Sequence, residues 1–175
     1  MIFRFLLFLF CLILLPVLSQ ELSSDEHELY RLVTEYRASK GLPKVALSQS
    51  LTLVAQLHSK DLSENRPDQG ECNGHSWSDK GEWTACCYTS DHAKASCMWD
   101  KPKELTRYKF PGYEISCVGG APLSPSLALD TWKKSKHHNA VLVNRDIWEA
   151  PWKAIGIGMY KGYATVWFGH EPDTN

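Results

Sequence analysis

Two apolar segments near the end of the chain predict a β-hairpin. Residues 154–160 and 163–168 read as strands, and Lys161-Gly162 between them is a short-hairpin signal. In the first segment isoleucine and methionine alternate with Gly156 and Gly158, so the two glycines share one face of the strand. Alternating glycines indicate that another element packs directly against the strand backbone. The chain must therefore fold with this face of its sheet closely covered.

Helical patterns fill the first part of the chain. Ser23, followed three residues later by Glu26, offers a capping box, and apolar residues then recur at helical spacings until residues 41–43 stop the helix. A second helix is expected over about 48–64. His58 lies on this second helix, and we interpret it as a packed or surface histidine rather than a ligand.

The middle of the chain has weaker periodicity. Residues 66–112 are rich in cysteine, tryptophan and glycine, and we expect bridges to hold this segment and a short helix to begin at 100–102, with Asp100 as its cap. A strand over 113–118 and a third helix over 124–136 follow. Helices first, then strands interrupted by a helix, predict an α/β sandwich rather than a doubly wound parallel sheet.

Residues 1–19 predict a secretory signal peptide. One early cation, Arg4, precedes an almost unbroken apolar run, and Val17 and Ser19 occupy the −3 and −1 positions of a small-residue cleavage site. Cleavage leaves about 156 residues, which suits a single domain over 20–175. An uncleaved anchor is the alternative, since the run approaches the length of a membrane span. We expect no transmembrane segment after cleavage and a secreted, extracellular protein.

The charge balance argues against nucleic acid as a partner. The chain has 19 Lys and Arg residues against 20 Asp and Glu residues, and Arg4 leaves with the leader. A slightly acidic chain supplies no overall electrostatic attraction to nucleic acid or to an anionic membrane.

An odd number of cysteines remains after cleavage. In an oxidising compartment most of them should pair, so we expect at most two bridges within the chain and one thiol that is free or bonds another chain. Adjacent cysteines make a strained bridge with each other, so the pair at 86 and 87 should face different partners. A zinc knot built on Cys72 and His75 is the alternative, which the compartment disfavours. The five cysteines are Cys72, Cys86, Cys87, Cys97 and Cys117.

Three polar residues stand out as candidates for a site. His75 lies in a Cys-Asn-Gly-His-Ser-Trp segment, Glu114 opens the strand at 113–118, and His138 lies just beyond the expected end of the third helix. Two neutral imidazoles and a nearby carboxylate can hold zinc while leaving positions open for water. The alternative is that these side chains hydrogen-bond one another and tie a loop to the sheet.

These residues lie in motifs that resemble the CAP superfamily of cysteine-rich secretory, antigen 5 and pathogenesis-related proteins. The resemblance covers nearly all of the mature chain, and its short motifs are specific in their order and spacing. They are Glu35-Tyr36-Arg37, Gly41-Leu42, Gly112-Tyr113-Glu114-Ile115, the run Trp132 to His138, Ile155-Gly156-Ile157-Gly158 and Trp167-Phe168-Gly169.

The resemblance implies a three-layer α-β-α sandwich with a mainly antiparallel central sheet and a cleft with two histidines and two glutamates. By position His75 and His138 are the histidines and Glu114 is one glutamate, while Ser135 occupies the place of the second. His137 is the alternative to His138 and lies beside it in the cleft. With one acidic residue missing, we expect at most weak binding of a divalent metal such as Zn²⁺.

The resemblance also ranks the functions. A non-enzymatic binding protein for a sterol, another lipid or an extracellular protein is the first expectation. A zinc-dependent peptidase or esterase, with Glu114 as its catalytic group, is the alternative. An effector that acts on membrane channels is disfavoured, because such family members carry a further cysteine-rich module and the sequence given stops shortly after the last strand.

Overall fold

The strand with alternating glycines lies inside a four-stranded sheet. The computed structural model describes residues 21–120 and 122–174, so the expected signal peptide falls outside the described residues. The strands have the order β1-β3-β4-β2; β1 runs parallel to β3, and the other two pairs are antiparallel. The sheet is therefore mixed but mainly antiparallel, as expected. Its strands are β1 (Ala46–Leu47), β2 (Tyr113–Val118), β3 (Ala154–Tyr160) and β4 (Tyr163–Gly169).

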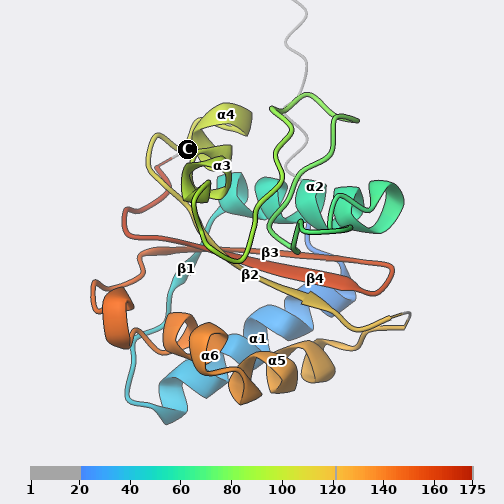
Figure 1. Ribbon diagram of the computed structural model, residues 1–175. Helices are drawn as coiled ribbons and strands as arrows, with labels where there is room; N and C mark the ends of the chain where they lie inside the picture. Colours follow the sequence, from blue (N-terminus) through green and yellow to red (C-terminus); the bar gives the residue numbers. More distant parts are fainter. Residues whose placement is uncertain (1–20, 121, 175) are drawn as a thin grey trace, which may run out of the picture.

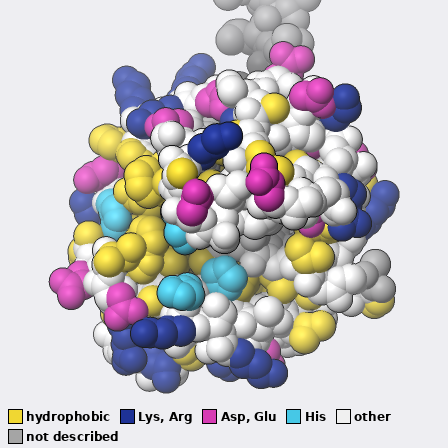
Figure 2. Space-filling model, viewed as in Figure 1, with side chains coloured by type: hydrophobic (Ala, Val, Ile, Leu, Met, Phe, Trp, Pro, Cys, Tyr) yellow, Lys and Arg dark blue, Asp and Glu magenta, His cyan; other side chains and the backbone are white. Residues whose placement is uncertain are grey.

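Helices cover both faces of this sheet (Figure 1). One layer holds α2 (Gln49–Asn65), with α3 (Ala95–Trp99) and α4 (Lys101–Leu105) beside it. The opposite layer holds α1 (Ser24–Ser39), α5 (Pro125–Lys134) and α6 (Lys136–Leu142), with the short 3₁₀ helix η1 (Asp146–Trp148) at one end. This arrangement confirms the three-layer sandwich. From the same side, hydrophobic side chains gather on the left of the surface and histidines lie among and beside them (Figure 2).

Helix α2 packs directly on the glycine face of β3. A Cβ atom at Gly156 would overlap the backbone of Leu51 and Thr52, and one at Gly158 would overlap the backbone at Ala55. The backbone of α2 therefore lies closer to β3 than a side chain at either glycine would allow. The expectation of a closely packed element is confirmed.

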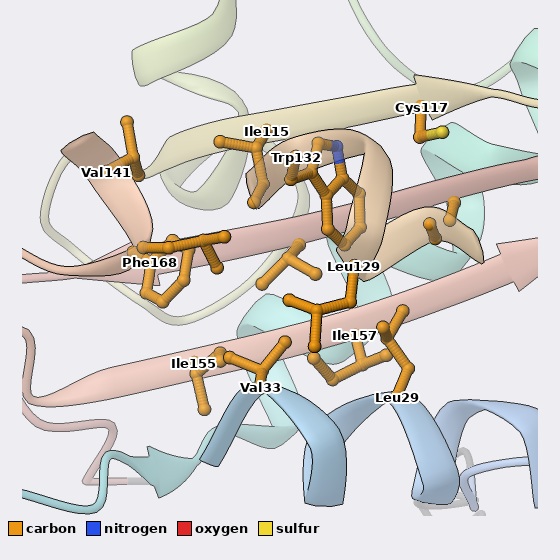
Figure 3. Packing of buried hydrophobic residues seen from close by; sticks show 14 of the residues in the cluster. Leu29, Val33, Ile115, Cys117, Leu129, Trp132, Val141, Ile155, Ile157 and Phe168 are labelled. Carbon is orange, nitrogen blue, oxygen red and sulfur yellow. The ribbon is translucent and has the colours of Figure 1, made fainter. Parts of the chain in front are cut away.

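The opposite face of the sheet carries the larger core. Leu29 and Val33 of α1 meet Ile155 and Ile157 of β3 in this layer, and Trp132 of α5 packs above them (Figure 3). All five of these side chains are buried. Burial of large apolar side chains contributes on the order of 2 kcal/mol each, so this layer anchors α1 and α5 to the sheet.

The helix ends follow their capping residues. Ser23 and Glu26 form the expected capping box at α1, and Ser48 caps α2 with a 2.9 Å bond from the Leu51 amide. The third helix differs from expectation: it breaks at Ser135, whose hydroxyl caps a separate helix, α6. His138 therefore lies in the first turn of α6 and not beyond a helix end. No helix of the described residues is long and apolar enough to cross a membrane.

Two disulfides hold the long segment between α2 and β2. Cys72 pairs with Cys87, and Cys86 pairs with Cys97, so the adjacent cysteines face different partners as expected. These bridges replace the alternative zinc knot. Among the described residues Cys117 of β2 is the free cysteine, and its side chain is buried in the core against α1 and α5.

Within the bridged segment, α4 begins where a helix is expected, but α3 precedes it without a sequence signal. Asp100 holds the N-cap position of α4 as expected, but its side chain makes no capping hydrogen bond. It accepts instead a 3.0 Å bond from Lys103 Nζ, because its backbone already has helical dihedral angles at the end of α3.

Candidate functional site

Glu114 lies at the centre of the polar cluster. It is the second residue of β2, whose side chains alternate, so Glu114 points toward α2 while Ile115 points into the opposite core. The residue is 5% exposed, and both of its carboxylate oxygens accept hydrogen bonds from histidines. Burial on its own would raise the pKa of Glu114, but the facing imidazoles outweigh burial and hold the pKa below its ordinary value. Glu114 is therefore an anion at neutral pH.

His58 supplies the first of these hydrogen bonds from the buried face of α2. Its Nδ1 lies 2.5 Å from Glu114 Oε1, and its Nε2 lies 2.9 Å from the carbonyl oxygen of Ser76. His58 therefore joins Glu114 of β2 to the loop at Ser76. Its ring stacks on Trp77 with a centroid separation of 4.1 Å.

His75 supplies the second hydrogen bond from the loop that follows Cys72. Its Nδ1 lies 2.7 Å from Glu114 Oε2, and its side chain is 16% exposed. The loop is held from both sides: the His75 amide donates to Asn73 Oδ1, and a Cβ at Gly74 would meet Ser116 Oγ of β2 at 2.7 Å. His75 thus connects the buried carboxylate to the surface, with its Nε2 left for another partner.

His138 approaches the same region from the opposite layer. Burial, with His75 and His137 nearby, lowers the pKa of His138 to about 4, so its ring is neutral at pH 7. Its Nδ1 is buried and has no hydrogen-bond partner in the described part of the chain. The backbone amide of His138 donates to Ser135 Oγ over 3.4 Å. The site therefore joins an engaged carboxylate to a neutral, unpartnered imidazole.

The arrangement does not supply a closed metal site. In residues 21–120 and 122–174 no group of three or more His, Cys, Asp and Glu side chains is placed to hold a metal ion. Both Glu114 oxygens already bind histidines, so the available nitrogens belong to His75 and His138. Catalytic zinc sites usually have three protein ligands. These residues do not fit a firmly held catalytic zinc. Two imidazoles, those of His75 and His138, are the side chains that could still bind a metal ion.

The sequence candidates separate into distinct roles. Glu114 and His75 are in contact, and His138 lies near enough to His75 for their charges to interact. Ser135 caps α6, and His137 is exposed beside the site. His58 was expected to be a packed or surface histidine; it is buried, and sequence reasoning missed its bond to Glu114. Its spacing from Leu51, Ala55 and Leu62 on the apolar face of α2 was the available signal.

We expect the free energy of unfolding of the metal-free protein to fall as the pH is lowered from 7 to 4. His138 takes up its proton near pH 6.5 when unfolded but only near 4 when folded, so protons favour the unfolded chain across this range. Allowing for partial solvent access, His138 should account for on the order of 2 kcal/mol. Urea denaturation in EDTA at several pH values measures this change.

The matched control for this prediction is His27→Asn, which changes an exposed histidine of α1. His138→Asn should reduce the loss between pH 6.5 and 4 by on the order of 2 kcal/mol, whereas His27→Asn should retain it. The interpretation is wrong if His138→Asn loses as much stability in this range as the unchanged protein.

Comparison with known proteins identifies the family. Residues 30–168 match the cysteine-rich secretory protein family, CAP. A search of curated proteins finds no match. An extracellular protein containing an SCP domain from Bacillus anthracis str. Ames has a TM-score of 0.57 and 19% identity, over 86% of this chain and 44% of its own. An outer surface protein from Borrelia burgdorferi has a TM-score of 0.56 and 17% identity, over 86% and 95%.

A cysteine-rich secretory protein from Staphylococcus aureus subsp. aureus Mu50 has a TM-score of 0.53 and 19% identity, over 84% of this chain and 39% of its own. The chain thus spans less than half the length of this protein and of the Bacillus anthracis protein. At these identities the solved structures show a shared fold. Because the family match extends over most of the sequence, from α1 to β4, the chain belongs to the CAP family of cysteine-rich secretory proteins.

Proposed function

We propose that the protein is a secreted, non-enzymatic binding protein for a lipid or sterol, or for an extracellular protein. The observation that carries this proposal is the complete engagement of Glu114, whose two oxygens bind His58 and His75. A general base must reach the proton that it removes, directly or through one water. A buried carboxylate with both oxygens occupied instead ties β2 to α2 and to the loop. The two disulfides fit an oxidising compartment.

An aromatic cluster at the start of β2 supports an apolar ligand. Four rings surround Tyr113 at centroid separations of 5.1 to 6.0 Å. Trp99 of this cluster is 38% exposed, and Ile147, which precedes Trp148 in η1, is 86% exposed. Exposed apolar surfaces of this kind mark binding sites. The four rings are those of Trp99, Trp148, Trp152 and His170.

The cluster adjoins the polar site because Tyr113 and Glu114 are consecutive residues of β2. On the surface, hydrophobic side chains lie beside histidines on one face of the molecule (Figure 2). An apolar ligand held over the aromatic cluster would have a polar group within reach of this histidine-bearing region. A sterol or fatty acid, with one polar end, has this chemistry.

Weak binding of a divalent metal such as Zn²⁺ forms part of the proposal. His75 Nε2 and His138 are the groups that would hold it, and a bound ion would polarise water or a ligand oxygen. Two imidazoles make a weak site. For the same reason zinc-dependent hydrolysis ranks second: it is favoured by the neutral, unpartnered ring of His138 but lacks a third ligand and a free base.

We expect the secreted protein to bind a fluorescent sterol or fatty acid saturably, with a dissociation constant in the micromolar range. The double variant Trp99→Ser/Ile147→Ser should weaken binding at least fivefold, because it removes an exposed ring of the aromatic cluster and the exposed side chain that precedes Trp148. Fluorescence titration measures the affinity. Leu127→Ser is the matched control, since Leu127 is 47% exposed on α5 and has no part in the cluster; it should leave the affinity unchanged.

One result would narrow the proposal and another would contradict it. Absence of saturable uptake by the folded protein would remove the lipid and sterol ligands and leave an extracellular protein as the partner. A peptidase or esterase activity that requires zinc and is lost in both His75→Ala and Glu114→Gln would establish the hydrolase instead.

A further inference from the structure

Two adjoining hollows lie around α4, away from the site at Glu114. One has a volume of about 680 Å³ and is bounded by the segment after α4 and by residues 172–174. The other, of about 580 Å³, lies between α3, α4 and the bridge of Cys86. Lys103 lines both, so the two hollows adjoin at this side chain, and we call the surface along them the strip. Neither is lined by Glu114 or by the histidines that surround it.

The strip carries an excess of basic residues. Positions 94–109 hold five lysines and arginines against two acidic residues, in a chain with a net charge of −1. Excess positive charge on an otherwise slightly acidic protein marks a local surface for anions. Lys and Arg side chains project over α4 on the surface, near the C-terminal segment (Figure 2).

The cations differ in how far their charge is already neutralised. Lys101 is buried and paired with Glu104, and Lys103 forms a surface pair with Asp100 at 3.0 Å, which solvent weakens. Arg107 and Lys109 form no ion pair with any described residue. The free positive charge is therefore concentrated in the larger hollow, beside Lys103.

The acidic residue of this hollow is already engaged. Asp173 Oδ2 accepts bonds from the Ser48 hydroxyl at 2.6 Å and from the Ser50 amide at 2.9 Å, at the start of α2. A carboxylate at a helix N-terminus is stabilised by the helix dipole. Asp173 therefore contributes to the beginning of α2, while Arg107 and Lys109 remain available to a ligand.

Two aromatic residues line one side of the larger hollow, and hydrogen bonds hold their segment in place. Phe110 is 45% exposed and its ring meets Tyr108 at 5.7 Å. Tyr108 donates to the carbonyl oxygen of Glu171 at 2.7 Å, and its own amide donates to Thr106 Oγ1 at 3.0 Å. These bonds hold the segment after α4 against the C-terminal segment, so the cations and the ring keep a fixed spacing.

We propose that this strip, formed by Lys103, Arg107, Lys109 and Phe110, binds a sulfated polysaccharide. Sulfate groups meet the cations, as in other lysine- and arginine-rich patches that bind heparin. A sugar face packs on the exposed ring of Phe110. A linear chain with charges at regular intervals matches the three cations that line the larger hollow.

An acidic peptide is the less suitable occupant. Peptides in shallow grooves often gain affinity by adding a strand to a sheet edge. Both hollows are lined by α3, α4 and loop segments and by no strand. The observations therefore favour a ligand recognised by its charges and its ring faces rather than by its backbone.

The test uses the secreted full chain and a heparin hexasaccharide, with calorimetry at several salt concentrations. We expect a micromolar dissociation constant at physiological salt and a slope of log affinity against log salt of about −3, because about three cations release counterions. Arg107→Ser/Lys109→Ser should weaken binding at least tenfold and bring the slope to about −1. Phe110→Ala should weaken binding about threefold and leave the slope unchanged.

The matched control is Lys40→Ser/Lys44→Ser, which removes the same charge from exposed residues around the end of α1 and should change affinity less than twofold. Hydrogen exchange of the unchanged protein, with and without saccharide, should show protection at 103–110 and so tests the site independently of variant folding. Three results would overturn the proposal: full affinity in Arg107→Ser/Lys109→Ser, an equal loss in the control, or equal affinity for polyglutamate of matched charge.

Discussion

Gly156→Ala is expected to lower the free energy of unfolding by about 3 kcal/mol or more, which reaches the upper range for overpacked cores. The added Cβ would overlap the backbone of Leu51 and Thr52 in α2. Side chains can rotate away from such a contact, but a helix backbone cannot, so the whole of α2 must move off the sheet. For a domain of this size the melting temperature should fall by about 10 °C.

Urea denaturation and calorimetry measure this effect, and Gly119→Ala is the matched control. A Cβ at Gly119 would meet only side-chain atoms of Leu123, which can rotate, so we expect a loss below about 1 kcal/mol. Equal stability of the two variants would mean that α2 does not rest on the strand backbone.

The placement of α2 also shows what the sequence alone can predict. Alternating Gly156 and Gly158 predicted a close neighbour, and the turn at Lys161-Gly162 predicted the hairpin, because in both cases the constraint lies in the local backbone. The turn residues adopt positive φ angles, as a tight hairpin turn requires. The capping box at Ser23 and the strand at 113–118 were predictable for the same reason.

Features that depend on distant contacts were not predictable. Strand β1 has only two residues, so its sequence shows no alternation of apolar and polar side chains. It forms because it pairs with β3. The break at Ser135 was missed because nothing in the helical pattern ends there; its hydroxyl caps α6 instead. The pairing of the four bridged cysteines depends on how the loop folds over α2 and β2, which spacing does not encode.

The site was half predictable. The motifs around His75 and Glu114 indicated two polar residues that the structure places in contact. His58 carried no motif, because a histidine on the apolar face of a helix looks like a packed residue until its partner is known. Its bonds to Glu114 and to the carbonyl of Ser76 come from elements far apart in the sequence.

This histidine makes Glu114 the residue whose loss we expect to be most costly in the site. Glu114→Ala should lower the free energy of unfolding by about 3 to 5 kcal/mol, because it leaves the buried Nδ1 of His58 without its carboxylate partner and frees the loop at His75. Glu114→Gln should cost less, since its amide oxygen still accepts from one histidine. Glu71→Ala, at an exposed position of the segment after α2, is the control and should stay within about 0.5 kcal/mol.

A double-mutant cycle separates the His58–Glu114 interaction from general loss of packing. His58→Ala removes the imidazole partner, so His58→Ala/Glu114→Ala should cost less than the sum of the two single variants, by on the order of 2 kcal/mol. Hydrogen exchange should show that the Ser76 and Trp77 amides lose protection in each single variant, because the loop is tied to α2 through His58 and to β2 through Glu114. Strict additivity would mean that the two side chains are only neighbours. A coupling of the expected size would mean that the buried carboxylate holds the loop in place, which is the property that leaves it unable to act as a base.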